Sequence, residues 1–114
     1  MVSAVARKSA ERVSADLGVL AEPHRLLVLR HLRRGARSAG FLAQAIGMSP
    51  SLASHHLAVL VSAGLVTRRQ KGQFVCYAAD RDRVRDLYRR LGQLAGAVGP
   101  AAADPAALAA DDPC

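Results

Sequence analysis

Hydrogen-bonding side chains gather between residues 49 and 62, in types and at a spacing suited to a nucleic acid. Ser51, Ser54 and His55 fall on one face of a predicted helix, opposite its apolar positions. Short hydroxyls let a helix approach base edges in the DNA major groove, and an imidazole can donate to a guanine or a phosphate. Ser49 caps the same helix, whose N-terminal amides favour a phosphate. The segment therefore predicts a helix that reads duplex DNA.

Three cations follow this helix at the tip of a predicted hairpin: Arg68, Arg69 and Lys71. Between residues 23 and 79 there are eight Arg or Lys residues and no Asp or Glu. The formal net charge of the whole chain is +7, which favours an anionic partner. Exposed cations are often merely solvated, but the absence of carboxylates around this tip favours a wing that contacts phosphates.

Metal ligands are scarce in the sequence and do not assemble locally. His24 and His31 are the weak candidates, yet they lie seven residues apart on one predicted helix. That separation is about 10.5 Å along the axis, too far to share one ion. His56 points toward the core side of its helix, where packing and a hydrogen bond are expected. A site built across a dimer from His24, His31 or residues of the C-terminal tail stays open, with nickel and zinc as candidate ions.

Catalysis and membrane insertion find no support in the sequence. There is no phosphate-binding glycine loop, and adjacent His55 and His56 would point about 100° apart on a helix. No apolar run approaches the roughly 20 residues that span a bilayer, and the N-terminus lacks a signal-peptide core. We therefore expect a cytoplasmic protein that is not an enzyme. In that reducing compartment Cys76 and Cys114 are expected to be free thiols.

The candidate DNA-binding groups require a scaffold of helices and one hairpin. Capping residues or prolines mark the helix starts, and glycines mark most of the ends. The predicted helices span about residues 9–20, 23–34, 39–46, 50–63 and 81–97, and the predicted strands span 65–70 and 74–79. On the second helix Leu26, Leu29 and Leu32 are the expected buried positions. Residues 1–8 and 98–114 are expected to be disordered tails of a single domain at 9–97.

The third and fourth predicted helices form a helix-turn-helix around a tight turn at residues 47–49. The fold class is therefore mainly α with a small β-hairpin, in the order α-α-α-α-β-β-α. Apolar stripes on the first and last helices predict a homodimer, because the last stripe is too long for this small core alone. The stripes consist of Val13, Leu17 and Leu20, and of Val84, Leu87, Leu91 and Leu94. A two-fold dimer would set two reading helices about 34 Å apart, one turn of DNA.

Four short motifs occur in a fixed order along the chain. They are acid-Pro-x-Arg at residues 22–25, Ser-His-His-Leu at 54–57, Ala-Gly-Leu-Val at 63–66 and Gly-x-aromatic-Val-x-Tyr at 72–77. As an ordered set they resemble the ArsR/SmtB family of bacterial winged-helix regulators, over roughly residues 17–95. The resemblance implies a homodimer on a palindromic operator, with repression relieved by an effector. It places the three cations in the wing, and Ser51, Ser54 and His55 at the base-reading positions.

The usual metal sites of that family are missing here. One uses a Cys-x-Cys pair at the start of the third helix, where residues 36–40 contain no thiol. Another pairs Asp and His on the last helix, which here has aspartates and arginines but no His. In its length and its missing ligands the chain resembles a nickel-linked actinobacterial branch of the family. That resemblance implies a second, co-regulator protein as a partner. A nonspecific architectural DNA-binding protein and a protein-interaction adaptor are the alternatives left open.

Overall fold

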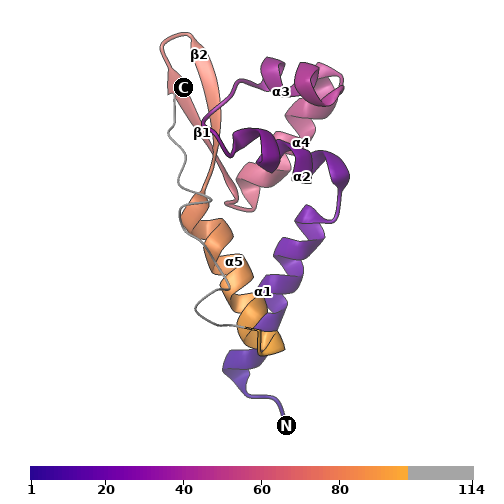
Figure 1. The fold of residues 1–114 in the computed structure, drawn as a ribbon, viewed down its shortest axis with the longest axis vertical. Helices are drawn as coiled ribbons and strands as arrows, with labels where there is room; N and C mark the ends of the chain where they lie inside the picture. The colour runs from indigo at the N-terminus through magenta and orange to yellow at the C-terminus, as the bar shows by residue number, and fades with distance from the viewer. Residues whose placement is uncertain (98–114) are drawn as a thin grey trace.

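The computed structural model describes residues 1–97 as five helices and a two-stranded antiparallel hairpin (Figure 1). The elements are α1 (Ala4–Leu20), α2 (Pro23–Leu32), α3 (Ala39–Ile46), α4 (Pro50–Ser62), β1 (Val66–Lys71), β2 (Phe74–Ala79) and α5 (Arg81–Ala95). This order confirms the predicted winged helix-turn-helix. The tail predicted at residues 98–114 lies outside the described residues. Within residues 1–97, no helix combines the length and apolar character needed to cross a membrane.

The first helix begins earlier than predicted. Ser3 caps α1 by accepting a hydrogen bond from the backbone N–H of Ala6 at 3.1 Å. Residues 4–8 are therefore helical, and the prediction of a disordered tail before Ser9 is wrong. The reason is that Ser3 and Ser9 are equally good caps, and no buried apolar residue precedes Val13 to mark the extra turn.

The boundaries of the helix-turn-helix follow the local sequence. Ser38 and Ser49 cap α3 and α4 by accepting hydrogen bonds from the backbone N–H groups of Phe41 and Leu52. Gly47 ends α3 with a φ of +85°, a left-handed conformation that glycine adopts without a steric cost. These three residues hold α3 and α4 at a tight turn and confirm the predicted motif.

The buried face of α2 differs from the predicted one. Val28 and Leu32 are fully buried, with Leu29 partly buried against them, whereas Leu26 is 51% exposed. The sequence PHRLLVLRHL carries apolar residues on most sides of the helix. Its spacing therefore does not select one face, and the packing of α2 against α3 and α4 decides which side is buried.

The core lies where α2, α3 and α4 meet the base of the hairpin. The largest fully buried side chains are Leu32, Leu42, Leu57, Leu60, Leu65, Val28 and Val66. Cys76 on β2 is also buried, and it is not a free thiol in the structure. The expectation of a free thiol at this position is therefore wrong. Cys114 lies outside the described residues.

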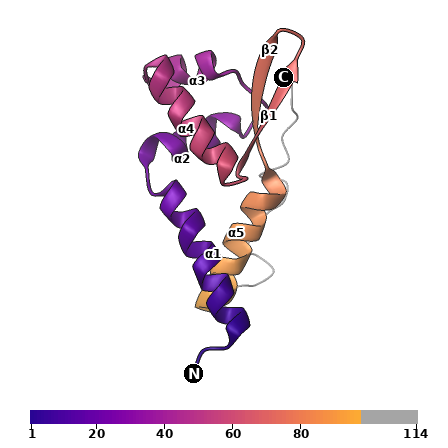
Figure 2. The ribbon, with the colours of Figure 1, turned by 180° about the vertical axis from the view of Figure 1, so that it is seen from behind.

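Helices α1 and α5 pack side by side as an arm that extends away from the other elements (Figures 1 and 2). The predicted dimer stripes run along this arm and divide into two groups. Val13 and Leu87 are core residues within one chain, and Leu20 and Val84 are partly buried. Leu17, Leu91 and Leu94 are exposed. Only the last group leaves an apolar surface for a second chain.

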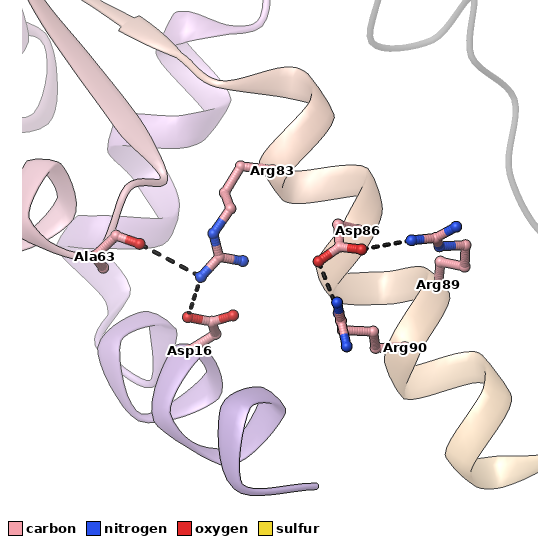
Figure 3. Close-up of polar contacts among 6 residues, drawn as sticks. All are labelled: Asp16, Ala63, Arg83, Asp86, Arg89 and Arg90. Atoms are coloured by element: carbon pink, nitrogen blue, oxygen red, sulfur yellow. Dashed lines mark hydrogen bonds and ion pairs between the residues drawn. The ribbon is translucent and has the colours of Figure 1, made fainter. Parts of the chain in front are cut away.

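A buried ion pair joins the two helices of the arm. The Asp16 carboxylate accepts a hydrogen bond from Arg83 at 2.7 Å, and the same Arg83 nitrogen donates to the carbonyl of Ala63 at 3.4 Å (Figure 3). Asp16 is 5% exposed. The hydrogen bond to Asp16 raises the pKa of Arg83 above its ordinary value. The pair therefore ties α1 to α5 and to the end of α4 at one point.

The other aspartates of α5 pair along their own helix. Asp82 lies 2.7 Å from Arg85. Asp86 accepts hydrogen bonds from Arg89 and Arg90 at 2.6 and 2.7 Å, as Figure 3 shows. Hydrogen bonds from these two arginines lower the pKa of Asp86. Much of the positive charge of α5 is thus balanced locally.

Candidate nucleic-acid interface

The exposed face of α4 carries the side chains predicted to read DNA. Ser51, Ser54 and His55 are all exposed, whereas Ala53 and Leu57 on the opposite face are fully buried. The apolar face anchors the helix, so the two hydroxyls and the imidazole project from the domain. The structure thus brings the three predicted reading residues together on one exposed surface.

Ser49 has a local structural role. Besides capping α4, its hydroxyl lies 3.4 Å from that of Ser51. The cap determines where α4 begins and hence where the first reading side chains stand. A direct contact of Ser49 with DNA stays a prediction.

The hairpin is held against the start of the helix-turn-helix. Arg37, just before α3, exchanges two backbone hydrogen bonds with Tyr77 of β2, at 2.9 and 2.8 Å. In the ladder Tyr77 lies opposite Arg68. The hairpin and α3–α4 lie together at one end of the molecule, opposite the arm (Figure 1). A duplex that contacts α4 is therefore within reach of the hairpin.

The three predicted wing cations are exposed on or near the hairpin tip. Arg68 and Arg69 follow each other on β1, so their side chains point to opposite faces of the hairpin. Lys71 shares a face with Arg69 and lies opposite Phe74, beside the turn at Gly72. The sequence alone predicts one group of three cations at the hairpin tip. The register instead divides them between two faces, which suits a wing that sits between two rows of phosphates.

A second polar cluster lies where α2 begins and packs on α4. Glu22 caps α2, and one of its oxygens lies 3.0 Å from Nδ1 of His24. Its other oxygen lies 3.7 Å from Nε2 of His56, whose ring stacks on that of His24 at 5.3 Å. Arg25 donates from Nε to Nδ1 of His56 at 3.1 Å. One ligand atom from each of Glu22, His24 and His56 lies within 4.8 Å of the others.

This cluster revises the sequence-based view of metal ligands. His24 belongs to it, but His31 does not, because Nδ1 of His31 lies 2.9 Å from the carbonyl of Leu27 on its own helix. His56 is buried and hydrogen-bonded, which confirms its predicted structural role. The sequence reasoning missed Glu22 and His56 as possible ligands. The available signal was only partial: Glu22 and His24 flank a helix-starting proline, but nothing local connects them to His56.

The pKa values of His56 and Glu22 in this cluster are displaced toward acid. Burial is the main cause that lowers the pKa of His56, and Arg25 and the neighbouring histidines add to it, while Glu22 opposes it. For Glu22, burial favours the neutral acid. Hydrogen bonds from His24 and from the backbone N–H of Arg25 outweigh that effect, and its pKa is lowered. At neutral pH the cluster therefore holds a neutral His56 imidazole beside an ionised carboxylate.

We expect the free energy of unfolding to fall as the pH drops below about 6.5, the ordinary pKa of histidine. The folded-state pKa values of His56 and Glu22 lie below their ordinary values, so the unfolded chain takes up protons first. The stability that His56 contributes is complete above pH 6.5 and is lost as the pH falls through its folded-state pKa. Urea unfolding at a series of pH values should show a flatter profile for His56→Gln than for His31→Gln. If the free energy of unfolding changed equally with pH in the two variants, His56 would not be the source of this pH dependence.

The sequence and the fold were compared with known proteins. Residues 22–68 match the family model described as "Bacterial regulatory protein, arsR family". The HTH-type transcriptional regulator NmtR of Mycobacterium tuberculosis is 41% identical over 71 residues, which cover 62% of this chain and 59% of NmtR. The nodulation protein NolR of Rhizobium meliloti is 33% identical over 78% of this chain and 73% of NolR. The chain thus aligns with about three fifths of NmtR and with most of NolR.

Solved structures show the same architecture. NolR from Sinorhizobium fredii superposes with a TM-score of 0.67 at 32% identity, covering 86% of this chain and 98% of that chain. Mb0332 from Mycobacterium bovis, described as a homodimeric winged helix-turn-helix DNA-binding domain, superposes with a TM-score of 0.61 at 30% identity. That match covers 84% of this chain and 91% of that chain. Both matches cover more of this chain than the helix-turn-helix and wing alone.

Proposed function

Because this chain belongs to the ArsR family of bacterial transcriptional regulators, we propose that it represses transcription as a homodimer bound to a specific operator. Family membership also confirms that it is not an enzyme. The observation that carries the proposal is the exposed α4 face of Ser51, Ser54 and His55 beside a cationic wing. Between residues 23 and 79 no carboxylate competes with DNA for this surface.

The dimer would form through the arm. Leu17, Leu91 and Leu94 remain exposed there after the chain has folded, and apolar side chains of this size gain stability when buried. The arm lies at the end of the molecule away from the wing, so pairing two arms leaves both reading surfaces free (Figure 2). The homodimeric description of Mb0332 supports this arrangement.

A metal ion is the effector class that the comparisons favour. The probable mercury resistance operon repressor of Streptomyces lividans is 37% identical over 68 residues, 54% of its length. The transcriptional repressor SmtB homolog of Synechocystis is 34% identical over 82 residues, 62% of its length. Both names also support repression as the sign of regulation. The co-regulator protein implied by the sequence resemblance finds no support in these comparisons.

Replacing both Ser54 and His55 with alanine is expected to reduce sequence selectivity by about tenfold or more, because a good base contact contributes roughly 1–3 kcal/mol of discrimination. An operator would first be selected from a random-sequence duplex library with the wild-type protein. Band-shift titrations would then compare this operator with a random duplex. Ser62→Ala, on the exposed end of α4, is the matched control and should keep the wild-type ratio.

The same titrations test the alternatives. A wild-type ratio near one would favour a nonspecific architectural DNA-binding protein, since specific binding is typically tighter by orders of magnitude. A protein-interaction adaptor would bind neither duplex at physiological salt. If the double variant lost affinity for both duplexes equally, Ser54 and His55 would not be base-reading residues.

A further inference from the structure

The cluster at the start of α2 has the composition of a transition-metal site. It offers two imidazoles and one carboxylate, from Glu22, His24 and His56. Imidazole suits zinc, nickel and copper, and a carboxylate completes such sites in many proteins. It differs from both family sites implied by the sequence resemblance, which would lie near residues 36–40 and on α5. No Cys takes part in it.

We propose that Glu22, His24 and His56 bind one divalent ion of the zinc or nickel class per protomer and thereby act as the effector site of the regulator. The ligand role stands by itself, whereas the effector role rests on the proposed function. The site has three protein ligands and so leaves a coordination position for water. Such a site is suited to reversible binding.

The geometry requires only a small contraction. Zn–N bonds of about 2.1 Å place tetrahedral ligands roughly 3.4 Å apart. The present donors lie within 4.8 Å of one another. The His24 and Glu22 side chains are 38% and 29% exposed, so they can move and an ion can enter. His56 is 7% exposed at its side chain and is the most buried of the three ligands.

Metal binding would also change a contact inside the protein. Because Nδ1 of His56 accepts a hydrogen bond from Arg25, the neutral ring carries its proton on Nε2, which faces Glu22. An ion bound at Nε2 needs that position free, so the ring proton must move through solvent to Nδ1. Arg25 Nε then faces a donor and must withdraw, although its Nη1 can keep its bond to the carbonyl of Val19.

This exchange takes place directly beneath the reading surface. His56 lies on α4, and its ring centroid is 5.5 Å from that of the exposed His55. Drawing His56 toward Glu22 replaces the link to Arg25 by a metal link between the start of α2 and the middle of α4. We expect this to shift α4 away from its DNA-binding position and so to weaken operator binding.

The test titrates Zn²⁺ and Ni²⁺ into the full-length apoprotein, with calorimetry and native mass spectrometry as readouts. Wild type should bind one ion per protomer, and His24→Gln and Glu22→Gln should each weaken binding by more than about 100-fold, beyond the roughly 10- to 100-fold typical of outer-shell partners. His31→Gln should bind like wild type. His56→Gln is included only if its circular dichroism is native. No binding, or equal binding in all variants, would overturn the metal site.

A second measurement separates the site from the regulatory role. Saturating Zn²⁺ or Ni²⁺ should lower operator affinity of wild type at least fivefold, within the usual range of allosteric coupling, and leave His24→Gln unchanged. Metal binding without this shift would overturn the effector role alone. Loss of metal binding with operator selectivity intact would overturn this inference and leave the proposed function standing. An ion-binding protein with no operator selectivity would overturn the proposed function and the effector role, and would leave only the metal site standing.

Discussion

Replacing Asp16 with alanine is expected to lower the free energy of unfolding by about 3 kcal/mol. The substitution removes the carboxylate that accepts the 2.7 Å hydrogen bond from Arg83, whose side chain is only 19% exposed. Breaking a buried pair on one side leaves an uncompensated charge, which costs about 3–5 kcal/mol. The partial exposure of Arg83 places the expected value at the lower end of that range. Urea unfolding followed by circular dichroism measures the change.

A matched variant separates this effect from ordinary loss of charge. Asp82→Ala breaks an ion pair of the same length, to Arg85, but the Asp82 side chain is 91% exposed. Exposed pairs contribute at most about 1 kcal/mol, so this variant should unfold nearly like wild type. All samples need the same protomer concentration, because dimerisation adds to apparent stability. Equal destabilisation by the two variants would show that burial of Asp16 is unimportant.

The combined replacement of Asp16 by leucine and Arg83 by methionine gives a second check. Removing both charges avoids the unpaired guanidinium, and apolar side chains of similar volume often replace a buried pair without loss of stability. We expect the double variant to be more stable than Asp16→Ala. If the double variant were instead less stable than Asp16→Ala, the ion pair would itself be a net source of stability.

Neutralising the wing is expected to weaken DNA binding strongly and without regard to sequence. Arg68→Ala with Lys71→Ala removes one cation from each face of the hairpin. In a dimer this removes four positive charges, so the slope of log affinity against log salt should fall by about 4, each phosphate contact contributing about 0.9. At physiological salt the affinities for operator and random duplex should both drop about 10- to 100-fold. Band-shift titrations at several salt concentrations give both quantities.

The control removes the same charge elsewhere. Lys8 and Arg12 are exposed on α1, in the arm, far from the wing. Their double replacement by alanine should change affinity and salt slope much less than the wing variant does. If it had the same effect, the net charge of the protein and not the wing would account for binding. A loss confined to the operator would instead assign base reading to Arg68 or Lys71.

The sequence by itself determined the local elements and the kind of partner. Ser38, Ser49 and Gly47 specify the helix-turn-helix because capping and left-handed glycine geometry depend only on neighbouring residues. The hairpin also depends on neighbouring residues, because two β-rich runs on either side of a turn are enough to predict it. The cationic character of residues 23–79 is a matter of counting charges, and it needs no coordinates. The expected DNA-reading face therefore matched the exposed face of α4.

Only the tertiary structure decided which distant residues meet. Asp16 and Arg83 are 67 positions apart, and His56 is 31 positions from Arg25, so no periodicity could connect them. The buried side of α2 was also undecided, because its apolar residues surround the helix and packing against α3 and α4 selects Val28 over Leu26. Proximity across the chain is set by how whole helices pack, which depends on all their side chains at once. The cluster of Glu22, His24 and His56 is the functional consequence of that packing.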